Sequence, residues 1–180
     1  MCRYITTVIL ASLLMSGSAW SETHTVSVHS IKDGDTIVVT INDKQEQLQL
    51  LGIDAPEDVP NPKLQKEIER TKLGMKQLIF IGKLATAHLS TLTAPGETAE
   101  VDANLGKRDR YGRIPAVVKN TSGRNINAAM VQDGYAVVMG RYPFDAALKA
   151  DLLQLQQKAI TEQLGLWGSH QESTKAWSGK

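Results

Sequence analysis

The sequence has few of the residues on which disulfide scaffolds and many catalytic metal sites depend. It contains one cysteine, Cys2, so no disulfide can form within the chain. The four histidines are scattered, and none has the His-Glu-x-x-His spacing of a zinc site. The sequence also lacks a Gly-x-Ser-x-Gly nucleophile motif and a phosphate-binding glycine loop. These absences direct attention to carboxylates and arginines.

An excess of one charge is also missing. The chain has 20 lysines and arginines against 19 acidic residues, which gives a formal charge of +1. A protein that coats DNA without regard to sequence usually has a strongly basic surface, so that class is disfavoured. A nucleic-acid enzyme is not excluded, because charges can be segregated on one face and a metal ion can add positive charge.

Long hydrophobic runs are absent after the first residues of the chain. Residues 5–14 are apolar, follow Arg3, and precede small residues at positions 19–21. This order predicts a signal peptide over residues 1–21, and the run is too short to span a membrane. A buried first helix is the alternative, but the run has no polar face. We therefore expect a secreted or periplasmic monomer that begins near Glu22 and is not membrane-bound.

The rest of the chain predicts an α+β fold, a small five-stranded barrel of the oligonucleotide-binding type with packed helices. The domain covers residues 22–168, and residues 169–180 form a loose, flexible tail. Strands are predicted where apolar and β-branched residues alternate, and helices where apolar residues recur every three to four positions. The predicted strands are 25–31, 36–41, 46–53, 98–101 and 114–119, and the predicted helices are 63–70, 74–92, 125–133 and 145–164.

Carboxylates lie at the ends of two predicted strands. Asp35 follows an Asp-Gly turn, and Asp54 and Glu57 flank a stiff Ala-Pro step. Three carboxylates without sulfur or imidazole nearby suit Ca²⁺ or Mg²⁺, and Arg113 suits a phosphate because guanidinium binds its oxygens in a fork. The alternatives are a solvated acidic turn at residues 54–57 and a charged turn with a local ion pair at residues 109–113.

Three motifs follow one another along the chain: Asp33-Gly34-Asp35-Thr36, Leu50-Leu51-Gly52-Ile53-Asp54-Ala55-Pro56-Glu57 and Asp109-Arg110-Tyr111-Gly112-Arg113. In this order they resemble the staphylococcal (thermonuclease) nuclease family. The resemblance covers about residues 25–167 and includes the helix ending at Gly134 and the Gly-Leu-Trp sequence near the end. The family consists of oligonucleotide-binding barrels with helices, and its enzymes are secreted, Ca²⁺-dependent phosphodiesterases that act on DNA and RNA.

The resemblance implies a role for each matching residue. Asp35, Asp54 and the Ala55 carbonyl would bind Ca²⁺. Glu57 would orient or deprotonate the attacking water, and Arg113 would stabilise the charged transition state. The implied nucleotide contacts are Arg110, Tyr111 and Tyr142.

One departure from the family pattern concerns catalysis. Gln49 stands where the family has the second arginine of the transition-state pair. Two functions are therefore open, a nuclease that is slow because of Gln49 and a weak or inactive module that binds nucleic acid or protein on the same barrel. The carboxylates kept together with Arg113 favour the enzyme, since a binding module for an anionic ligand needs no carboxylate trio. Residues 59–82 are also longer than in the staphylococcal enzyme and are expected to form a helical flap beside the site.

Overall fold

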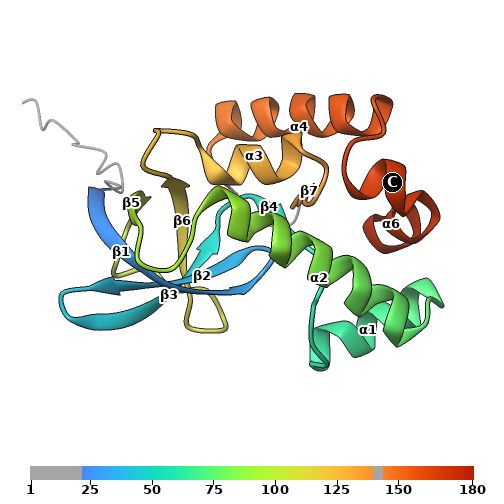
Figure 1. Cartoon of the computed structure of the whole chain (residues 1–180), viewed down its shortest axis with the longest axis horizontal. Helices are drawn as coiled ribbons and strands as arrows, with labels where there is room; N and C mark the ends of the chain where they lie inside the picture. Colours follow the sequence, from blue (N-terminus) through green and yellow to red (C-terminus); the bar gives the residue numbers. More distant parts are fainter. Residues whose placement is uncertain (1–21, 140–143) are drawn as a thin grey trace, which may run out of the picture.

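Apolar side chains at alternate positions close five strands into a barrel (Figure 1). Every second residue of β5 and β6 is buried, as expected for strands with one face on a core. The strand order is β1-β2-β3-β6-β5, and β1 pairs with β5 to close the sheet. The computed structural model describes residues 22–139 and 144–180. It confirms the predicted barrel, with strands β1 Glu22–Asp33, β2 Thr36–Ile41, β3 Lys44–Leu50, β5 Thr98–Ala103 and β6 Ile114–Lys119.

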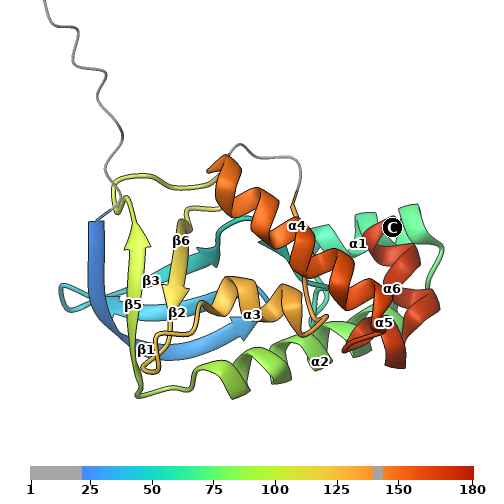
Figure 2. The same ribbon diagram turned by 90° about the horizontal axis from the view of Figure 1, so that it is seen from above.

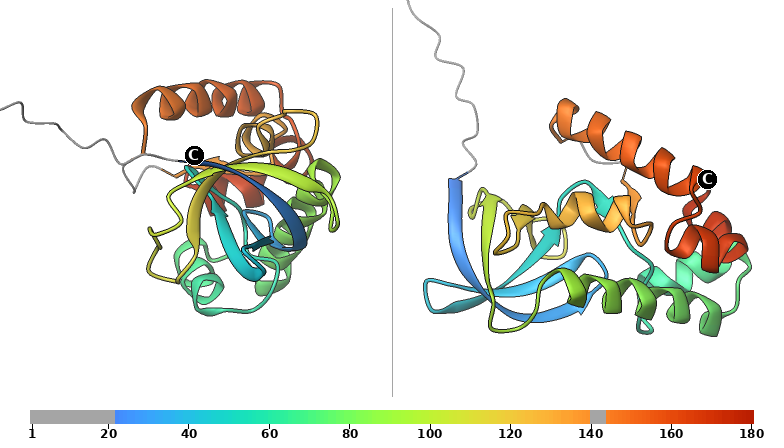
Figure 3. Two further views of the ribbon diagram at one scale, coloured as in Figure 1. Left: turned by 90° about the vertical axis from the view of Figure 1, so that its left-hand side faces the viewer. Right: turned by 45° about the horizontal axis from the view of Figure 1, so that its top comes forward.

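Helices cover the barrel on two sides and extend beyond it. α2 runs along β1 and continues past the barrel, while α3 and α4 lie one above the other on a second side (Figures 1 and 2). α1, α5 and α6 gather around the far end of α2 (Figure 3). Among the described residues, no helix has the length and apolar character needed to cross a membrane. The helices are α1 Pro62–Thr71, α2 Met75–Leu92, α3 Ile126–Gln132, α4 Ala146–Thr161, α5 Leu166–Ser169 and α6 Gln171–Ser178.

A short second sheet leads from the barrel to the acidic segment. The sequence predicts one strand over residues 46–53, which is wrong, because β3 ends at Leu50 and β4 (Ile53–Asp54) pairs with β7 (Val137–Val138) instead. Gly52 separates the two strands with a φ of +84°, a conformation that glycine adopts without a steric penalty. Its carbonyl accepts a hydrogen bond from the Met139 N–H at 2.8 Å. Asp54 therefore lies just outside the barrel.

A buried asparagine fixes the strand ends near this segment. The amide nitrogen of Asn127 donates to the carbonyls of Leu51 and Ala116, both at 3.0 Å. Its amide oxygen accepts the Val118 N–H at 3.0 Å. Asn127 is fully buried, so these bonds satisfy backbone groups that water does not reach. Helix α3 is thus tied both to β6 and to the chain that leaves β3.

The end of the chain differs from the predicted loose tail. Residues 171–178 form helix α6, and Trp177 is only 3% exposed. Its indole N–H donates to Glu67 Oε1 at 3.2 Å, and Arg70 donates to the carbonyls of Ala176 and Trp177 at 3.4 and 2.6 Å. The prediction of a loose tail is therefore wrong, because buried Trp177 and two side chains of α1 hold this polar segment in place. These contacts join residues more than 100 positions apart in the sequence.

Candidate active site

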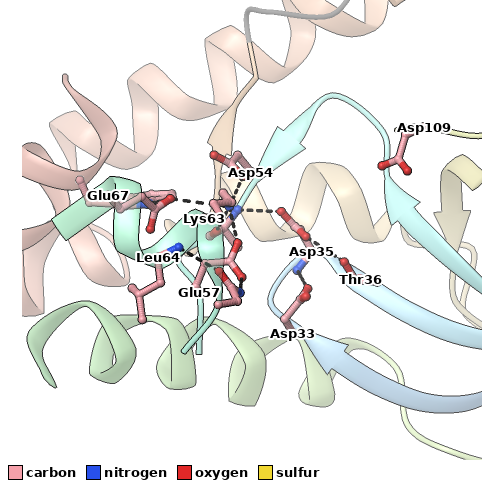
Figure 4. Close-up of polar contacts among 12 residues, drawn as sticks. Asp33, Asp35, Thr36, Asp54, Glu57, Lys63, Leu64, Glu67 and Asp109 are labelled. Carbon is pink, nitrogen blue, oxygen red and sulfur yellow. Dashed lines mark hydrogen bonds and ion pairs between the residues drawn. The ribbon is translucent and has the colours of Figure 1, made fainter. Parts of the chain in front are cut away.

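The turn between β1 and β2 brings Asp35 against the acidic segment. Asp35 is 6% exposed, and its Oδ2 accepts the Ala55 N–H at 3.0 Å. Its Oδ1 accepts the Thr36 hydroxyl at 3.0 Å. The first of these bonds joins residues 20 positions apart and fixes the turn relative to residues 54–57. The structure therefore brings together the predicted carboxylates of the first two motifs (Figure 4).

Lys63, in the first turn of α1, lies in the middle of this acidic cluster (Figure 4). Its Nζ is 2.8 Å from Asp54 Oδ1 and 2.6 Å from Glu57 Oε1. The same atom lies 3.3 Å from the Ala55 carbonyl oxygen and 3.7 Å from Glu67 Oε1. The Lys63 side chain is 33% exposed. An amino group thus occupies the centre of the predicted oxygen ligands.

Asn61 completes the contacts of Glu57. Its amide nitrogen donates to Glu57 Oε2, while Lys63 contacts Oε1. The Asn61 side-chain oxygen also caps α1 by accepting the Leu64 N–H at 2.9 Å, and Pro62 stands at the first helical position. Both oxygens of Glu57 are therefore engaged by residues at the start of α1.

Arg113 lies at the edge of the cluster and is held by three groups. Asp109 Oδ2 accepts from its Nε at 2.9 Å and its Nη2 at 2.8 Å. The third nitrogen of Arg113, Nη1, donates to the Thr36 hydroxyl oxygen at 3.1 Å and lies 3.9 Å from Asp35 Oδ1. The predicted alternative of a local ion pair is present here, but the same guanidinium also faces Asp35. Asp109 orients Arg113 and was not among the predicted site residues.

Tyr111 stands exposed beside two arginines. The guanidinium carbon of Arg110 lies 4.8 Å from the ring centroid, and that of Arg113 lies 5.2 Å from it. Tyr111 is 61% exposed, so its ring is accessible for stacking. Tyr142 lies outside the described residues, and its predicted nucleotide contact stays a prediction.

Gln49 faces the site from β3. It is directly opposite Thr36 in the antiparallel ladder, and opposed residues share one face of a sheet. The side chain is 5% exposed, and its Nε2 and Oε1 have no hydrogen-bond partner in the described part of the chain. On the other side Gln49 is opposite Pro115, which pairs only with β3 because the β5 pairing stops at Ala116. Gln49 thus leaves unpaired polar atoms beside the Thr36–Arg113 contact.

The pKa values reflect the crowding of negative charge. Burial and the Asp35 carboxylate raise the pKa of Asp33, just before the turn, to about 7. Burial also raises the pKa of Asp54, and this effect outweighs the attraction of Lys63. Burial alone would lower the pKa of Lys63, but the carboxylates around it raise that pKa well above its usual value. Lys63 therefore stays protonated and supplies the positive charge that this cluster requires.

The donor atoms of the cluster suit a hard cation. Carboxylate and carbonyl oxygens of Asp35, Asp54, Ala55 and Glu57 are the ligand types that Ca²⁺ prefers. In the arrangement described, no group of three or more acidic, histidine or cysteine side chains within residues 22–139 and 144–180 is placed to hold a metal ion. The Lys63 ammonium contacts oxygens of Asp54, Ala55 and Glu57. The residues therefore fit calcium by their chemistry, on condition that Lys63 gives way.

Comparison with known proteins identifies relatives of this chain. Residues 47–169 match the family model described as staphylococcal nuclease homologue, a range that begins after Asp35. An uncharacterized endonuclease of Escherichia coli is 33% identical over 137 residues, which cover 76% of this chain and 72% of that protein. The endonuclease YhcR of Bacillus subtilis is 29% identical over 147 residues, 79% of this chain. An uncharacterized protein of Bacillus anthracis is 30% identical over 146 residues, 81% of this chain. The chain spans 11% of the B. subtilis protein and 62% of the B. anthracis protein. Because the family match covers more than half of its length, the chain belongs to the family of staphylococcal nuclease homologues.

Proposed function

We propose that this protein is a Ca²⁺-dependent nuclease that hydrolyses phosphodiester bonds in DNA and RNA without sequence specificity. The observation that carries the proposal is the meeting of Asp35, Asp54 and Glu57 with Arg113 at one end of the barrel. Membership of the nuclease family and the endonuclease names of the relatives support it.

The residues divide into a cation site, a base and a phosphate site. Asp35, Asp54 and the Ala55 carbonyl would hold Ca²⁺, which when bound supplies positive charge to the phosphate and a site for water. Glu57 accepts a proton from the water that attacks phosphorus. The bond from phosphorus to the leaving oxygen then breaks, and that oxygen takes up a proton from the solvent. Arg113, oriented by Asp109, donates to the phosphate oxygens where negative charge develops.

Substrate contacts come from the loop that carries Arg113. The exposed ring of Tyr111 is suited to stack on a base or sugar, since every base has a face to stack on. Arg110 lies over the same ring and adds positive charge near the phosphates. Neither contact depends on base identity, which supports cleavage without sequence specificity.

A digestion assay tests the proposal. Plasmid DNA and a structured RNA are incubated with the purified protein in millimolar Ca²⁺ and in chelator. We expect both substrates to be cleaved with Ca²⁺ and to stay intact in chelator. Equal cleavage in chelator, or no cleavage with any divalent ion, contradicts the proposal.

Gln49 supports a second candidate, a weak or inactive binding module. Its neutral, unpaired amide stands where the family resemblance implies an arginine. In that case the same protein would bind a labelled oligonucleotide or a protein partner but leave the plasmid and RNA intact at every Ca²⁺ concentration.

We also propose that the protein is exported to the periplasm or the medium. Arg3, the apolar residues 5–14 and the small residues at 19–21 support a cleaved signal. The intact mass of protein recovered from periplasm and medium should correspond to a chain that starts near Glu22. A mass that still includes residues 1–21 would contradict this.

A further inference from the structure

The start of helix α1 brings a positive charge to the oxygens that the proposed function assigns to calcium. Lys63 Nζ contacts Asp54 Oδ1 at 2.8 Å and the Ala55 carbonyl at 3.3 Å. A calcium ion bound to the same two oxygens would lie within 2.3–2.6 Å of each. Two cations cannot share that space, because both steric overlap and charge repulsion oppose it. Binding of calcium therefore requires the ammonium to leave.

The same segment also engages the proposed base. Lys63 contacts Glu57 Oε1 at 2.6 Å, and the Asn61 amide donates to Oε2. With one donor on each oxygen, fewer of the acceptor sites of Glu57 are left for a water molecule. One movement of Lys63 would free an oxygen of Glu57 and vacate the cation site together.

We propose that Lys63 is a built-in competitor of the metal ion, a residue that fills the site in the metal-free protein and sets its calcium affinity. This inference rests on the proposed function, since it takes the Asp54 and Ala55 oxygens as calcium ligands. Without metal, the ammonium neutralises the crowded carboxylates. With metal, Lys63 turns outward and Glu57 becomes available to water.

The helix itself does not have to unfold for this exchange. Leu64 is 1% exposed in the core formed with α2 and the C-terminal helices. Glu67 accepts from Trp177, and Arg70 donates to the end of α6, so α1 is anchored to α6 by contacts that do not involve the Lys63 side chain. Lys63 is 33% exposed and has a flexible four-carbon stem. Movement of this one side chain is sufficient to open the site.

Calcium titration of matched variants of the full chain tests the proposal. Lys63→Met removes the ammonium and keeps an unbranched side chain, which is now apolar. Lys66→Met makes the same change at an exposed position of the same helix and is the control. Calcium affinity is measured by calorimetry, and melting temperature is measured in chelator and in calcium.

We expect Lys63→Met to bind calcium at least about tenfold more tightly, a change of about 1.4 kcal/mol. In chelator this variant should melt below the parent, because its carboxylates have lost their counter-charge. Calcium should then raise its melting temperature more than it raises that of the parent. Lys66→Met should match the parent in each measurement. Lys63→Arg, which keeps the charge, should stay close to the parent affinity.

The outcomes separate this inference from the proposed function. If parent and Lys63→Met bind calcium equally, or the variant binds more weakly, Lys63 does not compete and the inference is overturned while calcium dependence stands. If neither binds calcium, the calcium site of the proposed function fails, and the inference fails with it. If Lys63→Met does not fold, Lys63→Gln takes its place in the same titration, and its expected and contradicting results are the same.

Discussion

At the scale of single residues, we expect the proposed base, Glu57, and its surroundings to decide how fast the site works. Glu57 lies among Lys63, Asn61 and Asp54, and Arg113 stands at the other side of Asp35. Asp35 is fixed by a backbone bond, Glu57 is held by Lys63 and Asn61, and Arg113 is held by Asp109. Small changes of charge at these positions should therefore alter turnover more than they alter folding.

Glu57→Gln should lower turnover by about 10²–10⁴-fold, the usual contribution of a general base. The amide has nearly the same shape, so the Asp54 and Ala55 oxygens stay in place and calcium binding should be largely kept. Initial rates on plasmid DNA at saturating Ca²⁺ give the measurement, and the calcium-dependent melting temperature checks folding. Turnover near that of the parent would remove Glu57 from the mechanism.

Gln49→Arg should raise turnover by about 10²–10³-fold, because a donor aimed at developing charge is worth about 2.7–4 kcal/mol. Gln49 lies beside the Thr36 hydroxyl that Arg113 contacts, so a guanidinium there would add a fixed positive charge to the phosphate site. Substrate affinity should change less. Gln47→Arg, two residues away on the same strand and exposed, is the control.

Unchanged turnover of Gln49→Arg in a folded protein that binds calcium would contradict this view. Another cation would then already stabilise the transition-state charge, and the sequence offers Arg110 and Arg141 for this role. Introducing Arg110→Gln into the parent and into the Gln49→Arg variant would show whether Arg110 is that cation.

The predicted carboxylates could be located from sequence because each is fixed by its own short segment. Asp35 follows a tight turn, and Asp54 and Glu57 flank a stiff Ala-Pro step. Lys63 and Asn61 could not be found in this way, because their contacts depend on where α1 packs. The Asn61-Pro62 pair does signal a helix start at this point. It does not indicate that the next residue reaches back to Asp54.

At the scale of helices and strands, α2 is the support on which the acidic segment rests. Gly82 of α2 lies so close to this segment that a Cβ atom there would overlap the Glu57 carbonyl and lie 2.7 Å from the Asp58 nitrogen. Thr86, one turn later, donates to Asp58 Oδ2 at 2.7 Å. The backbone that presents Glu57 is therefore positioned by direct contact with a helix.

Gly82→Ala should reduce both stability and activity. The methyl group must push the Glu57–Asp58 backbone away from α2, and such overpacking destabilises by about 1–3 kcal/mol. Because Glu57 moves with this backbone, turnover should fall even at temperatures where the variant is folded. Lys83→Ala, at the exposed neighbouring position, is the control.

Thermal unfolding measures the stability of the variant, and initial rates at temperatures below its melting transition measure its activity. A Gly82→Ala variant with unchanged melting temperature and rate would show that the segment relaxes without cost. A lower melting temperature with an unchanged rate would show that α2 supports the fold but not the position of Glu57.

The sequence predicted the long helices and the barrel strands better than the end of the chain. The helix at residues 75–92 carries Leu78, Ile81, Ala85 and Leu89 at helical spacing, and all four are buried. Helix α6 has no such stripe. It is held by the Trp177 indole N–H, which donates to Glu67, and by Arg70, which donates to the Trp177 carbonyl. A pattern within residues 169–180 cannot reveal partners that lie in α1.

At the scale of the whole molecule, the nearly balanced charge sets how nucleic acid is held. The chain has a formal charge of +1, and without residues 1–21 it has 19 basic residues against 19 acidic ones. Several cations near the site are neutralised by partners, as Arg108 is by Glu46 at 2.8 Å. Attraction to the phosphate backbone must come from a few residues around the loop that carries the third motif. We expect weak, mildly salt-dependent binding in place of tight coating.

The expected salt dependence can be expressed as the slope of log affinity against log salt concentration. Lys107 and Arg110 are exposed and form no ion pair within the described residues, whereas Arg113 is paired with Asp109. Two neutralised phosphates predict a slope of log affinity against log salt of about −2 on duplex DNA. Binding is measured by fluorescence anisotropy in chelator, so that cleavage does not interfere. Arg110→Gln should make the slope shallower by about 1, whereas Lys175→Gln on α6 should leave it unchanged. A slope near −6 or steeper would mean that a broader basic surface, outside this loop, takes part in binding.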